Sequence, residues 1–461
     1  MILFLISSST CAALSINITQ YTKVKIRPLL NRYHPKVGII FSDKKGKVLF
    51  GYNANQYFSS ASIMKLFTAT AAISKLGANY RYKTQLLFNG RVSQSTLKGN
   101  VFIRFSGDPT LTTADIRNLV IRLKKRHIKT IQGNFYLDNN CFDHVNYPDG
   151  TAIDDLAFSY ASPIDAMTVD ENRFAVIISP SRKGTHPILR ATLPKKIIQL
   201  NNHLLCQKGN HSRITIRSDG HNHYSLSGLI SNKDGQLAES LAVRNLLPVI
   251  QYKLSQALEK NHITLKGRIE LGKIDPRARL ISTHSSVPLY TIVKTMLKDS
   301  DNLICNSLIK TLGSTQHRAG SFQNGIRVMK RTLSARSGIK FKRTRIKDGA
   351  GLSMYNIITP RQVMKLLVMI NRDPKLKKSI LPALPVAGKD GTLAYRMRQL
   401  AKYQRLIAKT GTLTGASNLA GYMKSRKNGS MIFVIMINQY TTKARPIKRW
   451  TDQYLKTIAL G

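Results

Sequence analysis

The sequence predicts a mixed α+β fold, in which an antiparallel sheet with packed helices is interrupted by a large, mostly β insertion. Three observations support this prediction. Both ends of the chain combine short apolar runs bounded by turn residues with stretches of helical apolar spacing. The middle of the chain shows short alternating segments instead. The chain has 461 residues, 42% of them hydrophobic, which is enough for more than one compact unit.

The N-terminal part is expected to supply a hairpin followed by a buried helix. Apolar runs at 37–41 and 48–52 flank the turn sequence Asp43-Lys44-Lys45-Gly46. From residue 62 to 76, apolar residues recur at helical spacing on almost every side, and Gly77 is expected to end the helix. A helix that is apolar nearly all round belongs in the centre of a domain.

The region 81–280 is interpreted as the insertion. It forms either a single unit or two nested subdomains. Turn residues separate strand-like segments at 85–88, 100–105, 133–137, 175–179 and 213–216. One helix is expected here, with Thr113 as its N-cap and an apolar face of Ile116, Leu119, Val120 and Leu123. The remaining parts, 22–80 and 281–461, are predicted to form one discontinuous domain.

The C-terminal part is predicted to return to helices and then to end in a sheet. Helical spacing covers 288–312 and 360–370, and strands are expected at 406–410, 418–424 and 430–438. The turn Lys427-Asn428-Gly429 joins the last two strands, and Pro446 is expected to begin a terminal helix.

The first 15 residues resemble a secretory signal without the usual basic residue ahead of its apolar run. Export would place the protein in the periplasm. Cys11 falls inside this segment and is expected to be removed with it. The alternative is a lipoprotein anchor attached to Cys11. Cys141 and Cys206 are candidates for a disulfide in an oxidising compartment. The cysteines lack the spacing typical of zinc sites.

The chain carries a formal net charge of +49, with 72 Lys and Arg against 23 Asp and Glu. The basic residues are dispersed, and no nucleic-acid-binding signature accompanies them. We therefore expect no nucleic-acid partner. A peripheral association with anionic membrane or wall polymer is one interpretation, and drift in surface composition is the other.

Three short motifs occur in order: Ser62-Ile63-Met64-Lys65, Ser300-Asp301-Asn302 and Lys409-Thr410-Gly411. The first alone is weak evidence, since Ser307 and Lys310 repeat its spacing. On a helix, however, residues i and i+3 share a face, so Lys65 can reach the Ser62 hydroxyl. A serine needs an adjacent base, and lysine serves only when burial or a neighbouring cation such as Lys409 lowers its pKa.

Together these motifs resemble the Ser-x-x-Lys, Ser-x-Asn and Lys-Thr-Gly set of penicillin-binding proteins and serine β-lactamases. The long separation of the first two motifs is similar to that in the D-alanyl-D-alanine carboxypeptidase/endopeptidase family of the penicillin-binding protein 4 type, peptidase family S13. Further stretches resemble this family at 107–111, 154–156, 348–353 and 388–393. The resemblance implies a penicillin-binding, β-lactamase-like transpeptidase domain and a serine hydrolase of peptidoglycan stem peptides, inhibited covalently by β-lactams, with no metal or cofactor.

The resemblance also implies a role for each residue. Ser62 would be the nucleophile and Lys65 its base, with Ser300 relaying protons and Asn302 holding the substrate amide. The backbone N–H groups of Ser62 and Thr412 would form the oxyanion hole. The substrate would be bound by Lys409, Thr410, Gly411 and Thr412, and its side-chain carboxylate by a pocket at Asp155 and Tyr160. Met354 and Thr414 stand where some relatives carry arginine and glutamine.

Two alternatives stay open at this point. A β-lactamase is disfavoured by the insertion and by the lack of an evident deacylating glutamate after Asn302. A non-catalytic, wall-binding relative is disfavoured because all the motif residues are present. The sequence leaves open the balance between carboxypeptidase and endopeptidase activity and the oligomeric state.

Overall fold

The computed structural model describes residues 17–209, 211–316, 318–403 and 405–461, so the predicted signal segment and Cys11 lie outside the described residues. The chain forms two compact units. The first comprises the described residues of Met1–Phe58, Thr359–Val368 and Pro385–Gly461, and the second those of Ser59–Ile358 and Met369–Leu384. The predicted insertion 81–280 falls wholly inside the second unit, and its limits stay a prediction.

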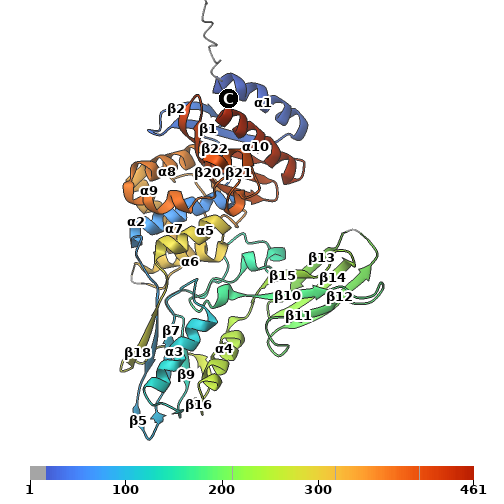
Figure 1. The fold of residues 1–461 in the computed structure, drawn as a ribbon. Coiled ribbons are helices and arrows are strands. Elements are labelled where there is room, and N and C mark those ends of the chain that lie inside the picture. Colours follow the sequence, from blue (N-terminus) through green and yellow to red (C-terminus); the bar gives the residue numbers. More distant parts are fainter. Residues whose placement is uncertain (1–16, 210, 317, 404) are drawn as a thin grey trace, which may run out of the picture. The chain divides into compact units, whose positions relative to one another are not determined.

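The first unit is built on a five-stranded antiparallel sheet in the order β2-β1-β22-β21-β20 (Figure 1). Strand β1 near the N-terminus pairs with β22 near the C-terminus, as expected of a sheet made from both chain ends. The strands are β1 (Lys36–Asp43), β2 (Val48–Tyr52), β20 (Leu406–Leu413), β21 (Ala416–Ser425) and β22 (Gly429–Asn438). All five include the segments predicted as strands, so this part of the prediction is confirmed.

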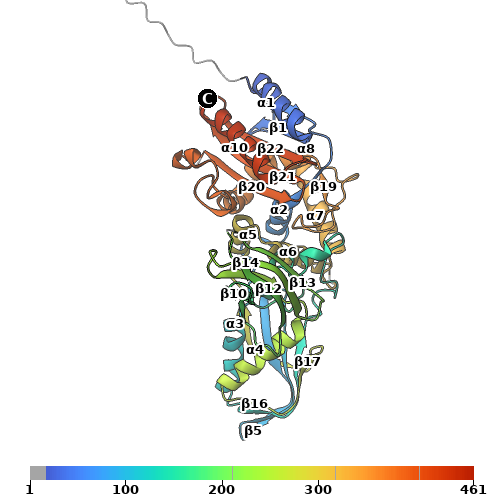
Figure 2. The same ribbon diagram turned by 90° about the vertical axis from the view of Figure 1, so that its right-hand side faces the viewer.

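Two helices from opposite chain ends cover one face of this sheet. Helices α1 (Ile18–Tyr33) and α10 (Ala444–Leu460) lie side by side (Figures 1 and 2). Their apolar side chains share one core with Val37, Ile39 and Phe41, the alternate residues of β1. The sequence did not indicate α1, and α10 begins two residues before the predicted Pro446.

The second unit holds a cluster of helices around α2 (Met64–Leu76), which a 3-10 turn, Ala61–Ile63, precedes. Every residue from Met64 to Ile73 is buried, and Gly77 follows the last turn, as predicted. Helix α2 packs against α5 (Leu289–Asp299), α6 (Asn302–Ser314), α7 (Phe322–Ser337) and α9 (Pro374–Ile380). Helix α8 (Pro360–Arg372) and strand β3 (Phe58–Ser59) run from one unit into the other.

The remainder of the second unit is rich in short strands. Its largest sheet has the order β17-β9-β7-β4-β18, and smaller sheets follow the orders β16-β8-β6-β5, β11-β10-β15 and β12-β14-β13. The strands are β4 (Lys83–Phe88), β5 (Arg91–Ser93), β6 (Thr96–Lys98), β7 (Val101–Arg104), β8 (Thr130–Ile131), β9 (Phe135–Asp138), β10 (Arg173–Ser179), β11 (Ile188–Ala191), β12 (Gln199–Gln207), β13 (Arg213–Ser218), β14 (His223–Ser231), β15 (Leu237–Ala242), β16 (Thr264–Leu265), β17 (Ile269–Leu271) and β18 (Arg279–Ser285), with β19 (Ile357–Ile358) beyond them.

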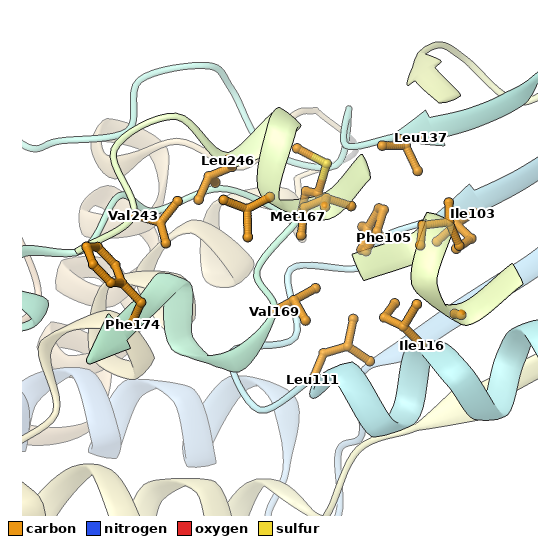
Figure 3. Packing of buried hydrophobic residues seen from close by; sticks show 14 of the residues in the cluster. Ile103, Phe105, Leu111, Ile116, Leu137, Met167, Val169, Phe174, Val243 and Leu246 are labelled. Carbon is orange, nitrogen blue, oxygen red and sulfur yellow. The ribbon is translucent and has the colours of Figure 1, made fainter. Parts of the chain in front are cut away.

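The described residues of this strand-rich part form two α-helices, α3 (Thr113–Lys125) and α4 (Leu246–Lys260), where the sequence indicated one. Ile116 of α3 belongs to one continuous core with Ile103 and Leu137 of the largest sheet (Figure 3). The predicted N-cap was wrong by one residue. Thr112 accepts the Asp115 N–H at 3.2 Å and caps α3, whereas the Thr113 hydroxyl bonds to the Asp170 carboxylate.

Cys141, Cys206 and Cys305 are free thiols, so the candidate disulfide between Cys141 and Cys206 is not formed. Within the described ranges, no helix is both long enough and apolar enough to cross a membrane.

Candidate active site

Ser62 lies in the 3-10 turn that leads into α2 and is half-buried. The turn is unusual, because Ala61 has φ +42°, a left-handed conformation that L-residues seldom adopt. Gly351 packs directly on this turn. A Cβ at Gly351 would lie 1.8 Å from the Ala61 carbonyl oxygen, so only glycine fits there. The surrounding chain thus fixes the backbone that carries the Ser62 hydroxyl.

Lys65 is the centre of the site. Its side chain is fully buried, and its Nζ lies 2.9 Å from Ser62 Oγ, 2.6 Å from Asn302 Oδ1 and 2.8 Å from the Ala350 carbonyl oxygen. Burial lowers the pKa of Lys65, while the nearby Cys305, Asp348 and Asp301 oppose this by raising it.

The three partners of Lys65 suit a neutral amine. Asn302 Oδ1 and the Ala350 carbonyl can only accept hydrogen bonds, so they take the two N–H donors of the amine. The nitrogen lone pair then remains for the hydroxyl hydrogen of Ser62. The same three oxygen atoms would also accept the three N–H donors of an ammonium. The arrangement therefore supports proton transfer without rearrangement of its partners.

The junction of α5 and α6 positions Asn302. Ser300, with φ +63°, ends α5 in a left-handed turn, and the Asp301 carboxylate caps α6 by accepting the Ile304 N–H at 2.7 Å. Asn302 is then the first residue of α6. Its Nδ2 donates to the Tyr160 carbonyl at 2.7 Å while its Oδ1 faces Lys65. Ser300 is half-buried in the same turn, two residues before Asn302.

Asp348 organises the loop that supplies the Ala350 carbonyl. Its buried carboxylate accepts the N–H groups of Gly351 at 2.7 Å and of Leu352 and Ser353 at 3.0 Å each. The Asn356 amide donates to it as well. The sequence placed 348–353 among the family-like stretches but gave Asp348 no role. The signal was present, since a carboxylate followed by Gly-x-Gly is typical of a turn whose N–H groups the side chain accepts.

Asp155 and Tyr160 form a pair next to this cluster. The Tyr160 hydroxyl donates to Asp155 Oδ1 at 2.8 Å, and its ring stacks on Phe158 with centroids 5.6 Å apart. Desolvation and the Asp155 carboxylate raise the pKa of Tyr160 far above its ordinary value, so its hydroxyl stays a donor. Met354 is 69% exposed and presents no charge. The backbone carbonyl of Tyr160 joins the pair to Asn302.

The Lys-Thr-Gly segment lies in the first unit, on β20. Lys409 is buried, pairs with Ala420 of β21, and its Nζ donates to the Thr410 carbonyl at 3.0 Å. The Thr410 hydroxyl donates to that of Thr392 at 2.8 Å, which ties it to the family-like stretch 388–393. Gly411 is buried, and Thr412 is exposed near the end of the strand.

Comparisons with known proteins agree over nearly the whole chain. The model of the D-Ala-D-Ala carboxypeptidase 3 (S13) family matches residues 29–457. The D-alanyl-D-alanine carboxypeptidase DacB of Haemophilus influenzae is 29% identical over 93% of this chain and 91% of its own length. A D-alanyl-D-alanine carboxypeptidase of an Actinomadura species is 27% identical over 88% of this chain and 78% of its own length.

A solved structure gives the same result. The crystal structure of penicillin-binding protein 4 from Haemophilus influenzae matches with a TM-score of 0.85 and 28% identity, covering 95% of this chain and 99% of that one. A second crystal structure of that protein, in complex with a β-lactam, matches with a TM-score of 0.80 and 27% identity, covering 95% of this chain and 100% of that one.

Proposed function

This chain belongs to the D-Ala-D-Ala carboxypeptidase 3 (S13) family, and from that premise we propose that Ser62 is its nucleophile and Lys65 the base that activates it. The chain is a penicillin-sensitive D-Ala-D-Ala carboxypeptidase, a hydrolase of peptidoglycan peptides. The observation that supports the two roles best is the 2.9 Å hydrogen bond between the buried Lys65 Nζ and Ser62 Oγ.

In the proposed reaction, Ser62 Oγ attacks the carbonyl carbon of the penultimate D-alanine as Lys65 accepts the hydroxyl proton. The C–N bond then breaks, the proton passes to the leaving amine, and the terminal D-alanine departs. Water hydrolyses the resulting ester and restores the Ser62 hydroxyl. The burial of Lys65 supports its assignment as the base, because a lysine whose pKa is lowered is more often neutral and able to accept a proton.

We assign further roles to the other motif residues. Asn302 keeps Lys65 oriented and contributes its amide to substrate binding, and Ser300 relays protons to the leaving amine. Lys409, Thr410, Gly411 and Thr412 bind the terminal carboxylate of the substrate. The N–H groups of Ser62 and Thr412 stabilise the oxyanion, and the loss of one such donor typically costs about 2.7–4 kcal/mol of transition-state stabilisation.

Asp155 and Tyr160 are proposed to contact the side chain of the third residue of the stem peptide. Tyr160 is 46% exposed, so one face of its ring is open to a ligand. Because Met354 cannot form a bidentate pair with a carboxylate, binding of a side-chain carboxylate at this position would need another basic group.

Endopeptidase activity is part of the proposal, since a D-alanyl cross-link presents the same carbonyl to Ser62 with a larger leaving amine. We also propose a periplasmic location, in which the +49 charge holds the enzyme to anionic membrane or wall polymer.

The function is tested with defined muropeptides. A pentapeptide stem should lose its terminal D-alanine, and pretreatment with penicillin should prevent this. A cross-linked dimer in the same assay measures the endopeptidase share. An enzyme that binds penicillin but releases no D-alanine from any stem would contradict the proposal.

A further inference from the structure

Helix α6 contains a second fully buried lysine, Lys310. Ser307 and Lys310 repeat the spacing of Ser62 and Lys65, yet their geometry differs. The buried Ser307 Oγ has no hydrogen-bond partner among the described residues, and Lys310 Nζ points to other groups. The repeated spacing therefore does not make a second nucleophile, and Lys310 needs another explanation.

Lys310 is held by oxygen atoms of one segment. Its Nζ lies 2.7 Å from Asp143 Oδ1, 2.7 Å from the Val145 carbonyl, 3.2 Å from the Ile164 carbonyl and 3.3 Å from the Asp143 carbonyl. The rings of Phe142 and Phe322 also flank it, with centroids 5.6 and 5.0 Å away. All three ammonium donors thus have acceptors.

Stability alone does not explain a charge at this position. Desolvation of an ammonium is costly, and an apolar side chain of the same volume in place of a buried ion pair is often neutral or stabilising. What an apolar side chain cannot do is bind three separate backbone carbonyls. The contacts therefore point to a role in fixing where these carbonyls lie.

The bonded carbonyls come from the two ends of the segment 143–164. Asp143 and Val145 lie at its start and Ile164 at its end, where the Ile164 N–H also donates to the Asn146 carbonyl at 2.9 Å. One ammonium therefore joins the two ends of this segment, and we call the place where they meet its neck. The segment carries Asp155 and Tyr160, and the Tyr160 carbonyl is the acceptor that orients Asn302.

Helix α6 connects this neck to the active site. Asn302, Asn306 and Lys310 are spaced by four residues and so share one helix face. Asn302 bonds to Lys65 and to the Tyr160 carbonyl, and Asn306 Oδ1 accepts the Gly349 N–H at 3.0 Å beside Ala350. This single face thus contacts both segments that surround Lys65.

We propose that Lys310 is a positioning residue of the active site, whose ammonium closes the neck of segment 143–164 so that the Tyr160 carbonyl holds Asn302 against Lys65. This inference rests on the proposed function of Ser62 and Lys65. Substrate does not contact Lys310 in this account. Its effect reaches the reaction only through Tyr160 and Asn302.

The test compares Lys310→Met with Lys253→Met by the second-order rate of acylation with a fluorescent penicillin, at a temperature where both variants are folded. Lys253, on α4, is the matched control. Its Nζ is also nearly buried and bonds to the Asp170 carboxylate and to the Thr113 hydroxyl. Acylation of Lys310→Met should fall on the order of 10- to 100-fold, the range expected for a misplacement near 1 Å. Lys253→Met should lower the melting temperature without slowing acylation.

A double mutant separates positioning from general destabilisation. In an Asn302→Ala background, Lys310→Met should slow acylation by no more than about twofold, because the group it acts through is already gone. If the double mutant lost the full product of the two single-mutant factors in acylation rate, the proposal would be overturned. It would also be overturned if Lys253→Met slowed acylation as much as Lys310→Met does. Lys310→Arg keeps the cation and should recover part of the rate.

If Lys310→Met does not fold, Asp143→Asn decides, because it weakens the same neck at a half-buried position. Its acylation rate should fall in the same direction by a smaller factor, and a rate equal to that of the wild type would overturn the inference. Failure of the wild-type protein to acylate at Ser62 would instead contradict the proposed function. The two failures are therefore distinguishable.

Discussion

Replacement of Asp348 by asparagine tests the loop that aligns Lys65. Each oxygen of this buried carboxylate accepts two donors: Oδ1 takes the Gly351 N–H and the Asn356 amide, and Oδ2 takes the N–H groups of Leu352 and Ser353. Asparagine retains one oxygen, so two charge-assisted bonds are lost whichever way the amide turns. At about 1.5–3 kcal/mol each, the loss is about 3–6 kcal/mol. That is a large share of the free energy of unfolding of a typical protein, which is about 5–15 kcal/mol.

The same change should alter catalysis in a definite direction. The Asp348 carboxylate raises the pKa of Lys65, so its removal lowers that pKa further. Since the proposed base, Lys65, would act in its neutral form, the acid limb of the acylation rate should move to lower pH. The maximal rate should fall, because the Ala350 carbonyl is no longer fixed.

The assays are denaturant unfolding and a pH profile of penicillin acylation. Asp234→Asn is the control, because this exposed carboxylate also accepts two hydrogen bonds, both from Ser212, and its loss should leave both measurements unchanged. A stability loss for Asp348→Asn below about 1 kcal/mol, the net value of one ordinary hydrogen bond, together with an unchanged acid limb would refute the reasoning.

Three further predictions use the same acylation assay or a simple fractionation. Lys65→Arg should nearly abolish acylation because arginine stays protonated, whereas Lys409→Arg should retain more activity because its charge matters more than its proton; equal losses would undercut this division. Gly351→Ala should slow acylation severely, since its Cβ would collide with a main-chain carbonyl, while Gly184→Ala, at a similar φ of +79° in open space, should only lower stability by about 1–2 kcal/mol. A wash at about 1 M salt should release the protein from membranes and sacculi, because the Debye length falls from about 10 Å to about 3 Å, and retention would point to an uncleaved apolar N-terminus or to a lipid on Cys11.

Much of the scaffold could be predicted because it depends on local patterns. The continuous apolar runs of β1 and β22 and the all-round apolar surface of α2 each follow from short stretches of sequence. Helix α1 escaped prediction because Pro28 argues against a helix interior and because basic residues alternate with its apolar residues between Lys23 and Arg27. Helix α7 was not predicted either, although its signal was present. Phe322, Ile326, Met329 and Leu333 recur at helical spacing after the N-cap Ser321.

The site was predictable only as far as side-chain chemistry is visible in sequence. Ser62, Lys65 and Asn302 were found, and the structure brings the three within hydrogen-bonding distance. The carbonyls of Ala350 and Tyr160 could not be found, because every residue has a carbonyl and only the tertiary fold decides where it points. The partners of Lys310 were hidden for the same reason.

The proposed mechanism depends most directly on the identity of the nucleophile. The protein should be acylated with penicillin, digested with trypsin and analysed by mass spectrometry. The adduct should fall on peptide 48–65, and fragmentation must place it on Ser62, because that peptide also contains Ser59 and Ser60. The adduct should lie on Ser62 and should disappear in a folded Ser62→Ala variant. An adduct on any other residue, or continued acylation of that variant, would contradict it.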